Sequence, residues 1–156
     1  MAPPSDDVYT KISTDAATEF VQTFYPALQS NRAMIASFYG TPASTIMFNG
    51  NAVADGHAVQ DIFVNQMPPS HYEVQSFDCQ IINKQFPTPT TRPLDPRKDI
   101  SILVMVSGYV RFGESRDLPQ RGFNETIILV PNPSTEPKGK RKRDWLIQTQ
   151  NFRLVV

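Results

Sequence analysis

The chain has 156 residues, a length that fits one domain with a single sizeable core and is too short for two separately cored domains. Its 15 Lys and Arg residues balance 15 Asp and Glu residues, which argues against a protein that coats nucleic acid by bulk charge. Residues 138–143 nevertheless hold five of these cations, so the rest of the chain has a net charge of −5.

The sequence contains no sign of secretion, of a membrane segment or of a metal site. No apolar run approaches the roughly 18 residues of a membrane span, and the first residues lack the features of a signal peptide. Cys79 is the only cysteine, and the chain has only two histidines, so there is no zinc-type ligand set. We expect an intracellular protein without metal, cofactor or membrane contact.

Residues 1–12 are polar and rich in proline at the start, and we expect them to form a flexible segment ahead of one domain at 13–156. A helix is predicted after residues 13–15, which supply an N-cap and a carboxylate for the first turn. Pro26 interrupts its apolar pattern and predicts a kink or an early end, because an interior proline costs about 3 kcal/mol.

Three short elements are predicted next. Residues 31–39 and 57–67 each place apolar residues at helical spacing, and Pro68-Pro69 ends the second of these helices. Between them, Asn49-Gly50 predicts the turn of a β-hairpin, because both residues accept a positive φ.

The rest of the chain reads as long strands that we expect to be twisted and bulged. A Pro-rich loop at 84–98 follows the first of them, and a loop at 131–143 ends in the basic cluster. Helices followed by antiparallel strands make an α+β domain with its helices on one face of a curved sheet. The predicted strands are 72–83, 99–113, 121–131 and 143–155.

The predicted sheet is apolar on both faces. Residues 100–112 place β-branched residues on one side of their strand, and Leu103, Met105 and Tyr109 on the other. Three helices can cover only one face, so the second face indicates a protein partner. The competing interpretation is that these are ordinary strands with scattered exposed apolar residues.

Arg153 ends the alternation that runs from Trp145 through Ile147 and Asn151 on the last predicted strand. A permanent charge beside an apolar surface needs a carboxylate partner. The sequence also allows an arginine that extends along the edge of the sheet into solvent.

Several strings resemble nuclear transport factor 2-like proteins, in particular the small subunits of the heterodimeric mRNA export receptor. The similarity runs from about Ala16 to Arg153, and Asn49-Gly-Asn-Ala-Val53 is its most specific part. The other strings are Phe20-Val-Gln-Thr-Phe-Tyr25, Asp78-Cys-Gln80, Ser107-Gly-Tyr-Val-Arg-Phe112 and Asn151-Phe-Arg153.

The resemblance implies a cone-like fold whose outer sheet face packs against the similar domain of a large subunit. The heterodimer would carry mRNA through nuclear pores by binding Phe-Gly repeat nucleoporins, shuttling between nucleus and cytoplasm, without a catalytic step. The resemblance implies that Arg153 pairs with an acidic residue of the partner. It also places Met105, Tyr109, Thr126, Ile128 and Asn151 on the partner side.

The basic cluster lies outside the common pattern of this family. It is interpreted as a sequence-nonspecific RNA contact, a nuclear localisation signal or a solvated loop tip. Its members are Lys138, Lys140, Arg141, Lys142 and Arg143.

Two alternative functions belong to the same superfamily. A homodimeric import carrier for Ran in its GDP form needs an acidic rim around an apolar cavity, whereas residues 113–119 mix both signs of charge. A ketosteroid isomerase-like enzyme needs carboxylates in the cavity under the sheet, for which Asp78 and Glu125 are the strand candidates, and no catalytic residue is assigned.

Overall fold

The computed structural model of the chain describes residues 3–43, 45–134 and 143–155. Within these residues, three helical segments accompany one sheet. They are α1 (Asp6–Ser30), the 3₁₀ helix η1 (Arg32–Phe38), and α2 (Gly56–Asp61), which continues as the π-helical turn η2 (Ile62–Gln66). The strands are β1 (Thr45–Phe48), β2 (Asn51–Val53), β3 (Ser70–Asn83), β4 (Ser101–Phe112), β5 (Arg121–Pro131) and β6 (Trp145–Leu154).

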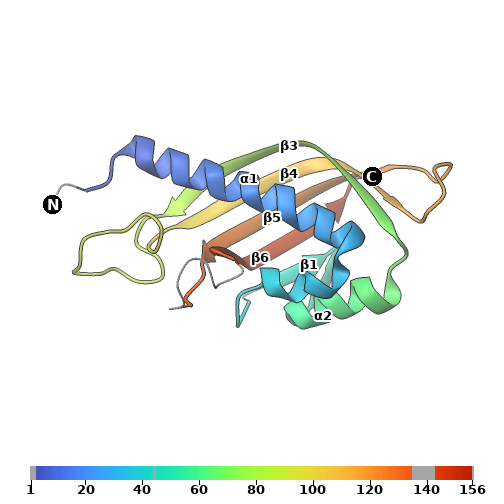
Figure 1. The fold of residues 1–156 in the computed structure, drawn as a ribbon, viewed down its shortest axis with the longest axis horizontal. Coiled ribbons are helices and arrows are strands. Elements are labelled where there is room, and N and C mark those ends of the chain that lie inside the picture. The colour runs from blue at the N-terminus through green and yellow to red at the C-terminus, as the bar shows by residue number, and fades with distance from the viewer. Residues whose placement is uncertain (1–2, 44, 135–142, 156) are drawn as a thin grey trace.

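The strands form one curved sheet in the order β2-β1-β6-β5-β4-β3. Figure 1 shows α1 lying across the long strands, with α2 at the end of the sheet that holds β1. The α+β prediction with helices on one face is therefore confirmed. The sheet is not wholly antiparallel, because β1 pairs with β6 in parallel. None of the described helices combines the length and the apolar character needed to cross a bilayer.

Helix α1 begins at Asp6, so the predicted start after residues 13–15 and the predicted flexible segment 1–12 are wrong for residues 6–12. Ser5 is the N-cap, and its hydroxyl accepts a hydrogen bond from the Val8 amide at 3.4 Å. Tyr9 in the added turns is buried, and the Lys84 ammonium lies 4.5 Å from the centre of its ring. Contacts with a distant segment therefore support the first two turns of this helix.

Pro26 does not end α1, which continues to Ser30, so the predicted early end is wrong. Ala27 and Leu28 beyond the proline are 5% and 3% exposed. The Asn31 amide then donates to the Ala27 carbonyl at 3.0 Å. Burial of the last turn thus outweighs the hydrogen bond that proline cannot donate.

The hairpin and the two shorter helices are confirmed. Asn49 and Gly50 have φ values of 48° and 88°, as a type I′ turn requires, and they join β1 to β2. Helix η1 occupies the predicted 31–39 segment, and α2 with η2 occupies 57–67.

The four long strands are confirmed within a few residues of their predicted ends, and they carry the expected bulges. One bulge in β3 lies between Val74 and Ser76. The backbone of Gly108 on β4 approaches β3 closely beside this bulge. A Cβ atom on Gly108 would lie 2.1 Å from the Glu73 carbonyl oxygen. The irregular β3 backbone therefore requires glycine at this position.

Arg32 ties three segments together near the end of α1. Its guanidinium donates to the backbone carbonyls of Phe63, Met67 and Pro68 at 2.7 to 3.1 Å, and to the Ser70 hydroxyl at 3.0 Å. Its Nε donates to the Leu28 carbonyl at 2.8 Å. One side chain thus joins α1, η2 and the start of β3, and it forms no ion pair with a carboxylate of the described residues.

We predict that Arg32→Ala lowers the free energy of unfolding by on the order of 3 kcal/mol, because several carbonyls lose a charged donor. Arg32→Lys should recover only part of this loss, since an ammonium cannot reproduce the guanidinium geometry. Urea denaturation monitored by circular dichroism measures both. The control is Arg116→Ala on an exposed loop, and equal stability of the Arg32→Ala and control variants would contradict the prediction.

Candidate functional site

The sheet face that α1 does not cover, which we call the outer face, is built from alternate residues of the long strands. Residues directly opposite each other on neighbouring strands point to the same side. Met105 lies opposite Thr126, and Thr126 lies opposite Asn151. The next row of the outer face consists of Leu103, Ile128 and Thr149.

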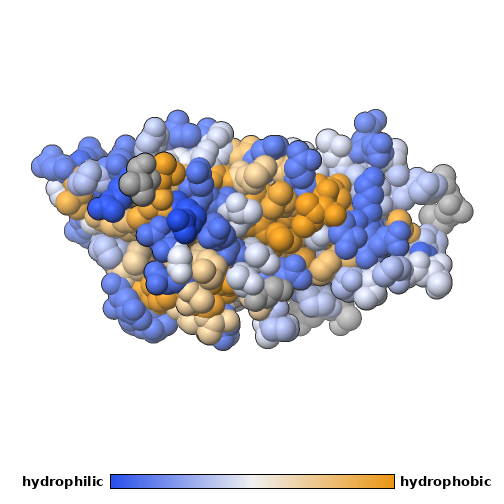
Figure 2. Space-filling view, turned by 180° about the vertical axis from the view of Figure 1, so that it is seen from behind, coloured by the Kyte–Doolittle hydropathy of each residue, from blue (hydrophilic) through white to orange (hydrophobic). Residues whose placement is uncertain are grey.

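Large apolar side chains are exposed on the outer face. Met105 is 41% exposed and Tyr109 is 46% exposed, whereas Val104 and Val106 on the other face of the same strand are 0% and 2% exposed. Figure 2 shows hydrophobic surface gathered over the middle of the side opposite the helices. A patch of this kind is typical of a protein interface.

The outer face extends beyond the residues predicted for it. Met47 of β1 lies opposite Asn151, and Asp78 of β3 lies opposite Met105, so one row crosses five strands. Val155 is 51% exposed beside Gly122, which has no side chain to cover it. Met47 could have been found from the alternation of its strand, because Ile46 on one side of it faces the core.

Arg153 is exposed on the outer face, opposite Asn124 of β5. One guanidinium nitrogen lies 3.8 Å from where a Cβ atom of Gly50 would be, so it sits beside the hairpin turn. The ion pairs among the described residues join Lys11 to Asp15, Lys84 to Asp6 and Arg92 to Asp99, and Arg153 takes part in none of them. Strand β6 lies inside the sheet, so Arg153 does not belong to an edge strand.

Strand β6 contains a bulge, so its side chains do not alternate as predicted. Thr149 lies opposite Ile128 and Ile147 lies opposite Leu129, which leaves Gln148 as an extra residue. Ile147 is therefore fully buried in the core, whereas Asn151 is exposed on the outer face. The prediction that Trp145 and Ile147 share a side with Arg153 is wrong.

The basic cluster falls mostly outside the described residues, which exclude Lys138, Lys140, Arg141 and Lys142. Arg143 is described, and its guanidinium carbon lies 3.4 Å from the centre of the Phe38 ring. Burial lowers the pKa of Arg143, and the nearby Glu19 carboxylate opposes this shift. Arg143 thus packs against the body of the domain.

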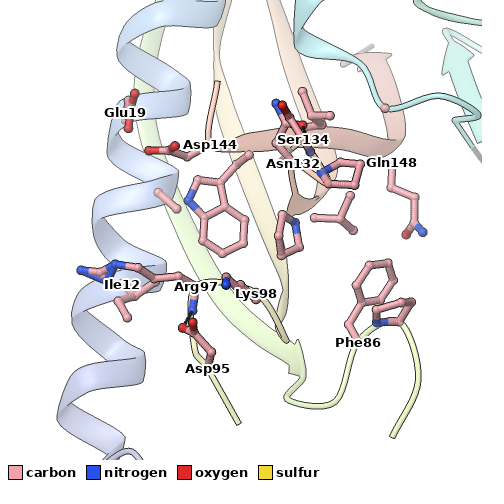
Figure 3. A pocket seen from close by; sticks show the side chains of 18 of the residues that line it. Ile12, Glu19, Phe86, Asp95, Arg97, Lys98, Asn132, Ser134, Asp144 and Gln148 are labelled. Carbon is pink, nitrogen blue, oxygen red and sulfur yellow. Dashed lines mark hydrogen bonds between the residues drawn. The ribbon is translucent and has the colours of Figure 1, made fainter. Parts of the chain in front are cut away.

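A pocket of about 970 Å³ lies between α1, the Pro-rich loop and the ends of β5 and β6. Figure 3 shows Glu19 and Asp144 on one side of it and Phe86 on the other. Asp15 and Asp95 add acidic groups to the lining, which also contains basic groups. The pocket wall therefore mixes both signs of charge with apolar surface, and it does not include Glu125.

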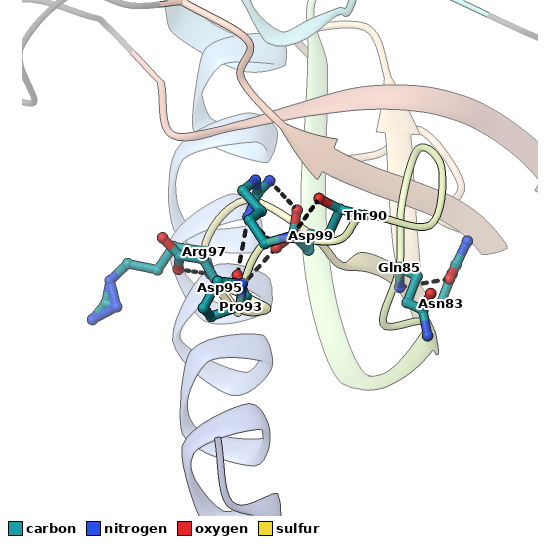
Figure 4. Close-up of polar contacts among 8 residues, drawn as sticks. Asn83, Gln85, Thr90, Pro93, Asp95, Arg97 and Asp99 are labelled. Atoms are coloured by element: carbon teal, nitrogen blue, oxygen red, sulfur yellow. Dashed lines mark hydrogen bonds and ion pairs between the residues drawn. The ribbon is translucent and has the colours of Figure 1, made fainter. Parts of the chain in front are cut away.

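Asp99 organises the Pro-rich loop. Arg92 donates to both of its carboxylate oxygens at 2.8 and 2.6 Å, and the Asp95 amide donates at 2.7 Å. Figure 4 shows these contacts gathered around Asp99, while the Arg97 side chain points away. The hydrogen bonds from Arg92 lower the pKa of Asp99. The loop is thus held in one shape by a buried carboxylate rather than extended freely.

A buried polar network lies under the sheet, on the side of the helices. The Tyr25 hydroxyl donates to Glu125 Oε1 at 2.6 Å, and the Gln150 amide donates to Glu125 Oε2 at 2.6 Å. The Tyr39 hydroxyl donates to the side-chain carbonyl of Gln150. Both Glu125 and Gln150 are almost completely buried, at 2% and 0% exposed. The carboxylate and its donors satisfy one another, so none of these groups is open to a substrate.

Burial raises the pKa of Glu125 to about 7, and the hydrogen bonds from Tyr25 and Gln150 oppose that shift. Burial also raises the pKa of Tyr25, an effect that the Glu125 charge reinforces. Asp78, the other candidate for a catalytic carboxylate, is exposed on the outer face and accepts a hydrogen bond from the Cys79 amide at 2.8 Å. Asp78 and Glu125 therefore lie on opposite faces of the sheet and share no site. Among the described residues, no three side chains of His, Cys, Asp or Glu converge as metal ligands would.

Comparison with known proteins places the chain in one family. The nuclear transport factor 2 (NTF2) domain model matches residues 16–151. The chain is 29% identical over 155 residues to NTF2-related export protein 1 of Bos taurus, covering 98% of this chain and 96% of the relative.

Solved structures agree with this match. The chain is similar, at a TM-score of 0.74 and 26% identity, to a chain of the Chaetomium thermophilum Mex67 NTF2-like domain complexed with Mtr2, covering 92% of this chain and 98% of that one. It is also similar, at a TM-score of 0.73 and 25% identity, to a chain of a Mex67:Mtr2 complex with a bound Sac3N peptide, covering 92% of this chain and 99% of that one.

We predict that Glu125→Gln removes a pH dependence from the folding stability. A carboxyl whose pKa is raised from 4.5 to about 7 on folding stabilises the protein below pH 4.5, and this contribution is lost as the pH rises towards 7. The wild type should therefore lose up to about 1 kcal/mol per pH unit across this window relative to the variant. Urea denaturation of both proteins between pH 5 and 8 measures the difference, and parallel curves would contradict the assignment.

Proposed function

We propose that the chain, which belongs to the nuclear transport factor 2 (NTF2) domain family, is the small, non-catalytic subunit of a heterodimeric mRNA export receptor. Its partner is the large subunit, whose similar NTF2-like domain covers the outer face. The observation that carries this proposal is the exposed apolar patch around Met105 and Tyr109, which three helices on the opposite face leave uncovered.

The chemistry of the outer face indicates how the partner binds. Met105, Ile128 and Tyr109 supply apolar contact area, while Thr126 and Asn151 supply hydrogen-bonding groups in their midst. Arg153 is the charged anchor, because its guanidinium is exposed and forms no ion pair with a described residue. A partner carboxylate opposite Arg153 would satisfy it by a bidentate contact.

The cellular role follows from membership of such a heterodimer. The assembled receptor carries mRNA through nuclear pores, where it binds Phe-Gly repeat nucleoporins and shuttles between nucleus and cytoplasm. Both the matched export-protein relative and the Mex67:Mtr2 structures support this role. RNA contact without sequence preference is assigned to the basic cluster, whose density of cations suits phosphate binding.

The buried network around Glu125 does not support a ketosteroid isomerase-like activity. The Glu125 carboxylate already accepts hydrogen bonds from Tyr25 and Gln150, and 2% of the residue is exposed. A general base needs access to the proton that it removes. We therefore assign Glu125 to the core of a binding protein.

Replacing Arg153 with Asp should prevent co-purification with the large-subunit NTF2-like domain of the same organism, because like charges would then face each other across the interface. Met105→Glu should also weaken binding, by at least about tenfold, since it buries a charge in the apolar patch. Co-expression followed by size-exclusion chromatography and calorimetry measures both effects.

The matched control is Arg97→Asp, which makes the same charge change in the Pro-rich loop, where the side chain points away from Asp99. It should leave the complex intact. Full binding by the Arg153→Asp variant would refute the anchor role. Light scattering of the chain alone adds a further check, because a stable homodimer at micromolar concentration would favour an import carrier for Ran in its GDP form.

Replacing Lys138, Lys140, Arg141 and Lys142 with Ser should weaken RNA binding and flatten its salt dependence, because fewer counterions are released. Arg143 is kept because it packs on Phe38. Gel-shift titrations of the heterodimer with a single-stranded RNA at several salt concentrations measure the slope. An unchanged slope would remove the RNA role and leave a localisation signal or a solvated loop tip, which nuclear import of a fluorescent fusion distinguishes.

A further inference from the structure

We propose that Glu125 is a proton-linked positioning residue for the outer face, so that binding of the partner is coupled to uptake of a proton at this carboxyl group. The inference rests on the proposed function, in that a partner domain covers the outer face. It concerns a residue that the partner does not touch, because Glu125 points into the core from the middle of β5.

The geometry of the network connects both layers of the fold. Glu125 is held by Tyr25 of α1 and by Gln150 of β6, each at 2.6 Å. Gln150 in turn accepts the hydroxyl proton of Tyr39, which follows η1. Side chains from α1 and β6 therefore meet at the Glu125 carboxyl group, and the end of η1 joins the network through Gln150.

The same two strands carry the polar part of the outer face. Asn124 and Thr126 flank Glu125 on β5, and Asn151 follows Gln150 on β6. Thr126 lies directly opposite Asn151. A change in the hydrogen bond between Glu125 and Gln150 therefore affects β5 and β6. The other side of these two strands faces the partner.

No described cation pairs with Glu125. The groups that face it are Tyr25 from α1, Tyr39 and Gln150 through the network, and Tyr72 from β3. Directly opposite it lie Val106 of β4 and Phe152 of β6, which are apolar. The hydrogen bonds to the charged carboxyl group therefore come from neutral donors, Tyr25 and Gln150, and a modest change in the surroundings can shift its protonation.

The network has two alternative hydrogen-bond arrangements. The ionised carboxylate accepts from Tyr25 and Gln150, as observed. The protonated group must donate its proton. If the Gln150 amide turns over, its oxygen accepts this proton and its nitrogen donates to the Tyr39 oxygen, while the Tyr39 hydroxyl proton turns away from Gln150. Both arrangements keep the side chains in place, so the site can change its charge without unfolding.

Partner binding favours the protonated arrangement for two reasons. The partner removes water from the outer face. The ionised form of the Glu125 carboxyl group, which lies just beneath the sheet, is then less well solvated and less favourable. The partner also pairs Arg153, which lies opposite Asn124, the neighbour of Glu125, with a carboxylate, so the positive charge on this part of the sheet is neutralised. Complex formation therefore takes up a proton, and the affinity rises as the pH falls.

The test is isothermal titration of the wild-type chain with the large-subunit NTF2-like domain between pH 6 and 8.5. The dissociation constant should fall by about threefold to tenfold as the pH is lowered from 8.5 to 6, the change produced by a rise of about half to one pKa unit on binding. Titrations at pH 7 in two buffers with different heats of ionisation should show net proton uptake.

Glu125→Gln keeps the shape of the side chain but cannot titrate, so it should abolish the pH slope and the proton uptake. The control is His57→Gln, which replaces an exposed imidazole of α2 and should keep the wild-type slope. Equal slopes for the wild type and Glu125→Gln, or no proton uptake by the wild type, would overturn the inference. Failure of the wild type to bind at any pH would instead overturn the proposed function.

Discussion

The helices that the structure describes cover one face of the sheet and leave the other uncovered, and the rest of the structure depends on this constraint. Along β4, Val104 is 0% exposed and its neighbour Met105 is 41% exposed, so a single strand holds both the core and an uncovered apolar surface. Apolar area of this extent is costly in water. The core of the domain is thus complete while its outer face is not, which is the property expected of a subunit that binds a partner.

Local patterns predicted most of the elements, and distant contacts explain where they failed. The Asn49-Gly50 turn and the four long strands follow from short-range chemistry, so the sequence alone was sufficient for them. The start of α1 was not predictable in this way. Its first turns depend on Tyr9, which is buried and contacts Lys84, a residue far away in the sequence.

The candidate site could be predicted only as far as strand alternation holds. On β4 and β5 alternation is regular between residues 102 and 110 and their partners, and it separates the two faces correctly. On β6 the extra residue Gln148 reverses the sides, which places Ile147 in the core and Asn151 outside. The residue types in the sequence do not reveal a bulge of this kind. The alternation of residues along the strand therefore does not predict the outward position of Arg153, whereas the family resemblance does.

The buried polar residues Glu125 and Gln150 are related to the bulge, because both concern the register of β6. A strand that slips by one residue turns every side chain to the opposite face, and such a slip on β6 would bury Arg153 and expose Phe152. The hydrogen bond between Gln150 and Glu125 forms only in the observed register, two residues after the bulge. The apolar side chains of β6 already favour this register, because Ile147 and Phe152 are buried in it. The buried network reinforces that register, and with it the set of β6 residues that face outward.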